Sequence, residues 1–186
     1  VTDHHIPGDT LPKCEALILC NNADEYPNRH ICGAGLACKV AEALLGREAA
    51  REYIPLAGIA TVADIVPLTG ENRVFAALAV KDIRRGKCPE GIKALCSVSQ
   101  TKLQDVSAGD FGFRIAPRLN AASRIEEADA AVSLLMETER ESAAKLAAKL
   151  DELNAKRKAE ESGIFNAACE KLANEDLTKR RCIVLH

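Results

Sequence analysis

The stretch Val1-Thr2-Asp3-His4-His5-Ile6-Pro7-Gly8 decides the fold that we expect for this chain. A short β-branched lead runs into an acid and two adjacent imidazoles, and a Pro-Gly turn follows. This pattern predicts a strand that carries metal-binding groups at its exit, which is where open α/β sheets bind their ligands. We therefore expect an α/β fold with a parallel sheet and a site at Asp3, His4 and His5.

The three polar residues of this stretch suggest a division of labour. Adjacent side chains on an extended backbone point to opposite sides, so His4 and His5 are expected to do different jobs. One imidazole can ligate a metal while the other meets the substrate, and Asp3 can accept a proton from the ring nitrogen that binds no metal. A solvated loop that happens to contain two histidines is the alternative.

Two later segments add to this expectation. Residues 57–68 form an almost unbroken apolar run around one carboxylate, Asp64, and an unpaired charge there would be costly. Asp64 is therefore expected to need a metal, a cation or several hydrogen bonds. Residues 111–124 combine the arginines Arg114, Arg118 and Arg124 with the amide of Asn120 and several small residues, which predicts an anion-recognition loop.

Composition limits the class of protein. The chain has 186 residues, 47% hydrophobic and 28% charged, which is typical of globular material. The net charge of −2 gives no general nucleic-acid signature, so any DNA contact must come from a local basic patch. No stretch approaches the roughly 18 to 20 apolar residues of a membrane span, and no signal sequence opens the chain. A cytoplasmic protein without membrane contact is expected.

The eight cysteines indicate the same compartment. None forms a C-x-x-C pair or a zinc-knuckle spacing, so we expect mostly small buried residues in a reducing cytosol and no catalytic thiol.

Periodicity predicts the elements around the site. Residues 16–20 read as a buried parallel strand, and residues 33–45 as a helix that Gly46 ends. Gly33 and Gly35 at its entry would permit close approach of backbone, either for helix packing or beside a phosphate or metal site.

Three further helices are expected along the chain. A mostly buried helix over 49–62 is predicted to carry Asp64 at or just past its end. A helix over 71–85 is predicted to turn Val74, Leu78 and Ile83 inward. Residues 139–174 predict a long helix with mixed charge on one side, about 50 Å at roughly 1.5 Å per residue, which is typical of a connector between domains.

Three strings in this order, TDHH at 2–5, ATVADIVPL at 60–68 and APRLNAASR at 116–124, resemble the DHH phosphoesterase superfamily, specifically its RecJ branch of single-stranded-DNA exonucleases. CGAG at 32–35, GENR at 70–73 and LNAKR at 153–157 extend the resemblance over most of the chain. APRLNAASR favours the RecJ branch over the small-molecule members.

The resemblance implies a domain layout. Residues 1–137 would be the C-terminal part of the DHH phosphoesterase domain, and residues 138–177 a long connector helix. Residues 178–186 would be the first strand of a second, DHHA1-type domain. The chain is accordingly expected to be an internal fragment.

The resemblance also implies two-metal phosphodiester hydrolysis with Mn²⁺ or Mg²⁺. In the family, one ion is held by the positions of His4 and Asp64 together with upstream aspartates that are absent from these residues. The position of His5 would face the scissile phosphate, with Asp3 supporting it or His4. With only half of the metal site, the isolated chain is expected to bind Mn²⁺ weakly and to hydrolyse little.

The signature string implies the contacts to DNA. Arg118, Asn120 and Arg124 match its phosphate-binding positions, and arginine offers a planar, permanently charged fork for phosphate. Ser123 stands where the family usually has Gly, which would strain a loop that needs positive φ. Phe111 and Phe113 could stack on bases, but core packing is the expected use of both.

The resemblance implies a 5′-to-3′ exonuclease of repair and recombination that acts on single-stranded DNA. It would be a monomer, with single-strand-binding protein and a helicase as candidate partners. Two alternatives stay open: another DHH phosphoesterase acting on cyclic dinucleotides, short RNA or pyrophosphate, and a catalytically silent relative that only binds a partner.

Overall fold

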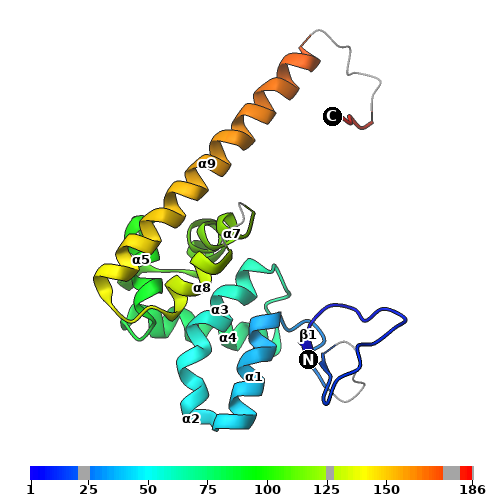
Figure 1. Cartoon of the computed structure of the whole chain (residues 1–186), viewed down its shortest axis with the longest axis vertical. Helices are drawn as coiled ribbons and strands as arrows, with labels where there is room; N and C mark the ends of the chain where they lie inside the picture. The colour runs from blue at the N-terminus through cyan, green and yellow to red at the C-terminus, as the bar shows by residue number, and fades with distance from the viewer. Residues whose placement is uncertain (21–25, 125–127, 174–180, 186) are drawn as a thin grey trace.

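A computed structural model describes residues 1–20, 26–124, 128–173 and 181–185, with the side chains of 123, 124 and 128 left aside. The described part is mostly helical with one small parallel sheet, so the expected α/β class holds only in this coarser form (Figure 1). In chain order the elements are β1 Thr2–Asp3, β2 Ile18–Leu19, α1 Gly33–Leu45, α2 Arg47–Ala50, η1 Arg51–Tyr53, α3 Ile54–Ala63, α4 Gly70–Arg84, α5 Glu90–Val98, η2 Leu103–Asp105, α6 Ala108–Asp110, η3 Phe111–Ile115, α7 Ala116–Arg124, α8 Ala128–Met136 and α9 Arg140–Leu172.

The sheet lies beside the N-terminal end of α1. β1 and β2 are parallel, with Thr2 opposite Ile18 and Asp3 opposite Leu19. The expected buried strand over 16–20 is therefore shorter than predicted, and Ile18 is exposed rather than buried. The sheet has two strands in the described part of the chain, so few neighbours cover their side chains.

Helix α1 matches the prediction at both ends. The Sγ of Cys32 accepts a hydrogen bond from the backbone N–H of Gly35 at 3.4 Å, which caps the first turn. Gly46 ends the helix with φ of +84°, a conformation that favours glycine.

The helix predicted over 49–62 is broken into three pieces, α2, η1 and α3. Pro55 lies in the first turn of α3, where a missing N–H costs nothing, so a new helix begins there. As expected, Asp64 caps the end of α3. In α4, Ile83 is buried as predicted, but Val74 is 54% exposed, and Phe75 and Ala79 face the core instead.

The main core lies between α3, α4, α5, α8, α9 and the segment 111–122. Close contact between helices depends on small residues: a Cβ on Gly58 of α3 would lie 2.6 Å from the carbonyl oxygen of Phe75 in α4. The buried apolar residues of this core include Ala79, Ile83, Ile92, Leu95, Val106, Phe111, Ile115, Leu134, Ala147 and Leu150.

The segment expected to be an anion-recognition loop is helical. Helix α6 precedes it and begins with a capping box in which the side chains of Ser107 and Asp110 each bond the other residue's backbone N–H. A π-helical turn, η3, follows, and the backbone N–H of Ala116 donates to the carbonyl of Phe111. Pro117 has no backbone N–H to donate to the carbonyl of residue 113, so a regular α-helix would lose a hydrogen bond here. The wider π-helical turn fits before this residue. The loop prediction was wrong because small residues that permit close backbone approach fit a packed helix as well as a loop.

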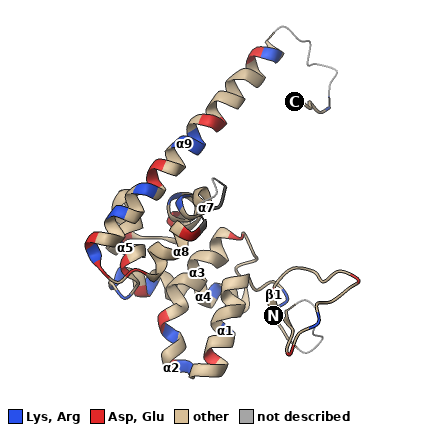
Figure 2. Cartoon of the chain, viewed as in Figure 1, with Lys and Arg blue, Asp and Glu red and all other residues tan. Residues whose placement is uncertain are grey.

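Helix α9 spans 33 residues and extends well beyond the other helices (Figure 1), as the predicted long helix required. Its first half packs on the core through Ala143, Ala147 and Leu150, whereas Ile164 and Phe165 are exposed. Figure 2 shows positive and negative residues interspersed along it. None of the helices in the described part of the chain has the length and apolar character that a bilayer span requires.

Candidate metal centre

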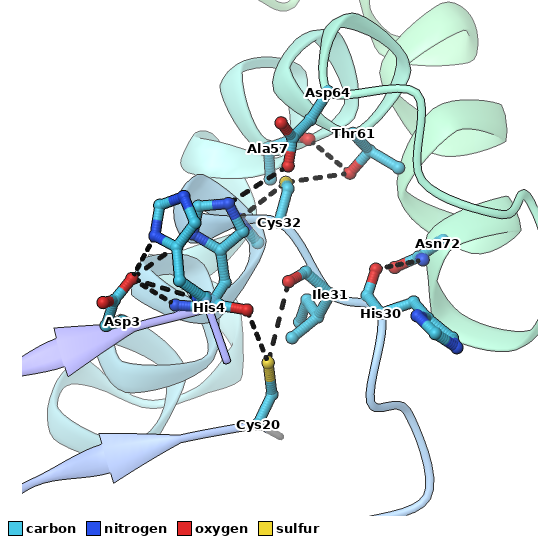
Figure 3. Close-up of polar contacts among 12 residues, drawn as sticks. Asp3, His4, Cys20, His30, Ile31, Cys32, Ala57, Thr61, Asp64 and Asn72 are labelled. Atoms are coloured by element: carbon cyan, nitrogen blue, oxygen red, sulfur yellow. Dashed lines mark hydrogen bonds and ion pairs between the residues drawn. The ribbon is translucent and has the colours of Figure 1, made fainter. Parts of the chain in front are cut away.

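His4 and Asp64, sixty residues apart in sequence, meet in the structure. His4 follows β1 and Asp64 caps α3, and the Nε2 of His4 lies 3.3 Å from the Oδ2 of Asp64 (Figure 3). The side chains are 25% and 44% exposed, so the pair lies at the surface of the fold. Asp64 is not enclosed by the apolar residues around it in sequence, since α3 ends at this residue and leaves the carboxylate open to solvent on one side.

Asp3 organises the backbone and the second imidazole of the motif. Its Oδ1 accepts hydrogen bonds from the backbone N–H of His4 at 2.7 Å and of His5 at 3.2 Å. The same oxygen lies 2.8 Å from Nδ1 of His5. The backbone and side-chain hydrogen bonds from His5 hold the pKa of Asp3 below its usual value, so this carboxyl is an anion at neutral pH.

The two imidazoles do not point to opposite sides of a strand. Their ring centroids are 4.1 Å apart and their planes are tilted by 42°. Strand β1 ends at Asp3, so the alternation that the prediction assumed does not extend to His4 and His5. The rings still differ in environment, because His5 is 75% exposed and His4 is turned toward Asp64.

Glycine 33 brings α1 against the first imidazole. A Cβ at this position would lie 3.2 Å from Nδ1 of His4, closer than ordinary contacts allow. Gly35 has a different role, since its Cβ would meet the side chain of Ile31. Of the two uses considered for these glycines, Gly33 lies close to the candidate site and Gly35 lies close to a packed side chain.

A cavity of about 520 Å³ opens beside His4 and Asp64. Helices α1, α3, α7 and α8 contribute to its walls, which are mostly apolar apart from the two site residues, Cys32 and Asn120. The remaining lining residues are Gly33, Ala34, Leu56, Ile59, Ala60, Ala63, Ala116, Leu119 and Leu135. The cavity joins the DHH string to the APRLNAASR string, which the sequence places more than one hundred residues apart.

The three residues predicted to bind phosphate lie in different surroundings. Asn120 is exposed and lines the cavity. Arg118 is 13% exposed and faces α9, where its Nε and Nη2 lie 2.8 and 2.7 Å from the Oδ1 of Asp151. The side chain of Arg124, like that of Ser123, lies outside the described residues. Asp151 was missed from sequence, and only its position two residues before LNAKR hinted at it.

Other residues were assigned only in part. Phe111 is buried as expected, but Phe113 is 85% exposed and is not a core residue. Of the basic residues of LNAKR, Lys156 pairs with Glu152 and Arg157 with Glu161 along α9. Asn72, in the GENR string, was quoted without a role, yet it is almost fully buried.

The cysteines fit their predicted structural use in part. All eight are free; Cys20, Cys32, Cys38 and Cys96 are buried, whereas Cys14, Cys169 and Cys182 are exposed. Burial raises the pKa of Cys96 to about 12, which keeps this thiol neutral.

The donor set suits a hard divalent cation. Ligand atoms of Asp3, His4 and His5 lie within 4.8 Å of one another, and Asp64 adds a carboxylate on the far side of His4. Adjacent ligands of an octahedral ion bound at about 2.1 Å are roughly 3 Å apart, close to the separation of His4 Nε2 and Asp64 Oδ2. The carboxylates suit Mg²⁺ or Mn²⁺, and imidazole is a common ligand of divalent first-row metals. Fold and donors thus define a candidate divalent-metal site at the exit of a parallel strand.

Comparisons with known proteins agree with the resemblance that the motifs indicated. No family model matches the chain. Its sequence is 39% identical to the single-stranded-DNA-specific exonuclease RecJ of Salmonella typhimurium over 96% of the chain, and 40% identical to RecJ of Bacillus subtilis over 99%. The chain spans 34% and 23% of the lengths of these relatives.

Solved structures agree with the sequence comparisons. RecJ of Thermus thermophilus in complex with Mn²⁺ matches 99% of the chain and 27% of its own length, with a TM-score of 0.81 and 31% identity. An exonuclease RecJ bound to manganese matches 91% of the chain and 43% of its own length, with a TM-score of 0.80. The resemblance that the motifs indicated is confirmed: over nearly its whole length the chain is similar to part of RecJ in sequence and in fold.

Proposed function

We propose that these residues are part of a single-stranded-DNA exonuclease of the RecJ type that hydrolyses phosphodiester bonds with two divalent metal ions. The observation that carries the proposal is the meeting of His4 with Asp64 beside a cavity that also contains Asn120. The relatives are named single-stranded-DNA-specific exonucleases, and solved RecJ structures hold Mn²⁺ or Mg²⁺. Digestion from the 5′ end belongs to the same proposal.

His4 and Asp64 are the proposed protein ligands of one ion, with Mn²⁺ or Mg²⁺ as the cofactor. When bound, divalent ions stabilise the charge that develops on the phosphate and make an attacking water more acidic. His4 would present Nε2 as a neutral imidazole, and Asp64 would present a carboxylate oxygen, 3.3 Å away. Two protein ligands hold an ion weakly, so we expect the 186 residues alone to hydrolyse little or no DNA.

His5 and Asp3 are proposed to act on the substrate side. Asp3 Oδ1 lies 2.8 Å from Nδ1 of His5, which favours the tautomer with its proton on Nδ1. The other ring nitrogen of His5, Nε2, does not take part in this contact. Because His5 is 75% exposed, its ring can reach a scissile phosphate. Asp3 also holds the backbone of both histidines, so it orients the whole motif.

The phosphate contacts are proposed for Asn120, Arg118 and Arg124. Asn120 supports this role by its place on the cavity wall. Arg118 already donates to Asp151, so a DNA phosphate would have to compete with this carboxylate for the guanidinium.

The proposed layout places the DHH domain in residues 1–137, a connector helix in 138–177 and the first strand of a second domain in 178–186. The exposed second half of α9 supports the connector role, because its apolar residues Ile164 and Phe165 lack cover within the described part of the chain. Residues 181–185 are not in a strand in this structure, and residues 178–180 and 186 lie outside the described part. A place in DNA repair and recombination, in the cytoplasm, completes the proposal.

The test is an assay of the complete protein with Mn²⁺ on single strands labelled at the 5′ or the 3′ end. We expect shortening from the 5′ end that EDTA stops. Ala replacements of His4 or Asp64 should abolish cleavage and leave the circular dichroism spectrum unchanged, because both side chains are at the surface. Asp105→Ala, which removes an exposed carboxylate in η2, is the matched control and should keep its activity.

Three results would contradict the proposal. Full activity in either site variant would remove that residue from the site. Hydrolysis of cyclic dinucleotides, short RNA or pyrophosphate without digestion of long strands would indicate another DHH phosphoesterase. Binding of a partner with no hydrolysis at any metal concentration would indicate a silent relative.

A further inference from the structure

Asn72 is a buried polar residue that links the two segments supporting the candidate metal centre. It lies in the first turn of α4 and is 1% exposed. Its Nδ2 donates to the carbonyl oxygens of His30 at 2.8 Å and Pro67 at 3.0 Å. Its Oδ1 accepts a hydrogen bond from Nδ2 of Asn28 at 3.0 Å. Figure 3 shows the contact with His30, at the start of the segment that leads to Cys32.

The chemistry of the side chain explains why an amide is needed here. A carboxamide offers two donor hydrogens and an acceptor oxygen on one short, planar group, and all three functions are used. An apolar residue would fill the same space in α4 but would remove the donor to the His30 carbonyl and one of the two donors to the Pro67 carbonyl, both at part-buried positions. The amide therefore joins backbone segments as well as filling the core.

The first of these segments follows Asp64. Ile65 has φ of +56°, the left-handed region that a β-branched residue rarely adopts, and such strain persists only where the surroundings hold it. Two residues later, the carbonyl of Pro67 accepts from both Asn72 and the backbone N–H of Thr69. Asn72 thereby fixes the turn that directs the chain away from Asp64.

The second segment, residues 28–33, contacts His4. Its carbonyl at His30 is held by Asn72, and two residues beyond Ile31 the chain reaches Gly33, against the His4 imidazole. The thiol of Cys20 connects the same backbone to the motif, with Sγ 3.8 Å from the carbonyl oxygen of His4 and 3.9 Å from that of Ile31. A shift of this segment would move the surface on which His4 rests.

We propose that Asn72 is a positioning residue that sets the separation of His4 and Asp64 and thereby the affinity of the site for its divalent ion. The inference rests on the proposed function, because it assigns Asn72 to the same metal site. Loss of the amide frees the turn after Asp64 and the segment beneath His4 together. Replacing groups that orient metal ligands typically weakens metal binding by about 10- to 100-fold.

The experiment measures Mn²⁺ binding by electron paramagnetic resonance, and the Mn²⁺ concentration for half-maximal cleavage, in the complete protein. For Asn72→Ala we expect Mn²⁺ binding to weaken, and the Mn²⁺ concentration for half-maximal cleavage to rise, each by about tenfold or more. KM for single-stranded DNA at saturating Mn²⁺ should stay within about twofold of wild type. Ser99→Ala is the matched control, since Ser99 is buried and bonded to Cys96 and Thr101 within α5 and its end. It should lower the melting temperature without changing the Mn²⁺ dependence.

Each outcome decides the inference. A folded Asn72→Ala with wild-type Mn²⁺ dependence overturns it, as does an equal shift in Ser99→Ala. If Asn72→Ala is unfolded, Asn28→Ala decides instead, because it removes one of the three bonds: a shift of about two- to threefold is expected, and no shift overturns the inference. Asp64→Ala is measured in parallel. If Asp64→Ala keeps the wild-type Mn²⁺ dependence, the proposed function itself fails. If Asp64→Ala loses it and Asn72→Ala keeps it, the inference alone fails.

Discussion

The helical core and the candidate metal centre are held together in different ways. In the core, α3 contacts α4, and α5 contacts α8, through apolar side chains and close backbone approaches at Gly58 and Gly91. At the metal centre, the side chains of Asp3, His4 and Asp64 are partly exposed. Polar contacts among them and the close approach of Gly33 to His4 hold them in place. The free energy of unfolding and the geometry of the site should therefore respond to different substitutions.

The largest effect on stability is expected at Gly91 in α5. A Cβ there would clash with the carbonyl of Leu134 in α8, and rigid backbone cannot yield as a side chain can. Gly91→Ala should lower the free energy of unfolding by about 3 kcal/mol or more, measured by urea unfolding. The control is Gly163→Ala in the exposed part of α9, which has open space at its Cβ and should gain about 0.5 to 1 kcal/mol. Equal stability of the two variants would contradict the described packing.

A smaller effect on stability but a clear effect on metal binding is expected at Gly33. In Gly33→Ala the new Cβ would press on Nδ1 of His4 and turn the ring away from Asp64. Mn²⁺ binding in the complete protein, followed by electron paramagnetic resonance, should weaken by about tenfold. The melting temperature should change little, since the imidazole is partly exposed and can move. Gly163→Ala again serves as control, and unchanged Mn²⁺ affinity in Gly33→Ala would separate this glycine from the site.

The smallest effect is expected at the capping box that begins the helical segment 108–124. The hydrogen bond from the Ser107 side chain, followed by that from its backbone, holds the pKa of Asp110 below its ordinary value of 3.8. Because the pKa of Asp110 is lower in the folded than in the unfolded state, the stabilisation by these hydrogen bonds is complete once the pH exceeds the unfolded value, at about pH 3.8 to 5. It is lost as the pH falls through the folded-state value. Ser107→Ala should cost about 1 kcal/mol at pH 7 and less near pH 3. A difference between wild type and variant that stays constant over this range would contradict the assignment.

The sequence predicted local structure well where local preferences and tertiary packing agree. Helix α1 runs from Gly33 to Leu45 as expected, and the charged helix α9 has nearly its predicted bounds. The prediction failed over 111–124, because a π-helical turn over Phe111–Ile115 leads directly into α7, which has Pro117 in its first turn, and no local pattern distinguishes this from a loop. Exposure was misjudged at Val74 and Phe113 for a related reason, since periodicity reveals an apolar face but not which neighbours cover it.

The sequence by itself determined the chemistry that is available here: tandem imidazoles after a short strand, a carboxylate in an apolar run, and an order of motifs that resembles the RecJ branch. Only the tertiary structure decided which groups meet. It brought His4 to Asp64, turned Arg118 to Asp151, and placed the Asn72 amide between two loops. The physical reason is that residue types and spacing report the preferences of neighbouring residues, whereas contacts across thirty to sixty residues depend on how whole helices pack.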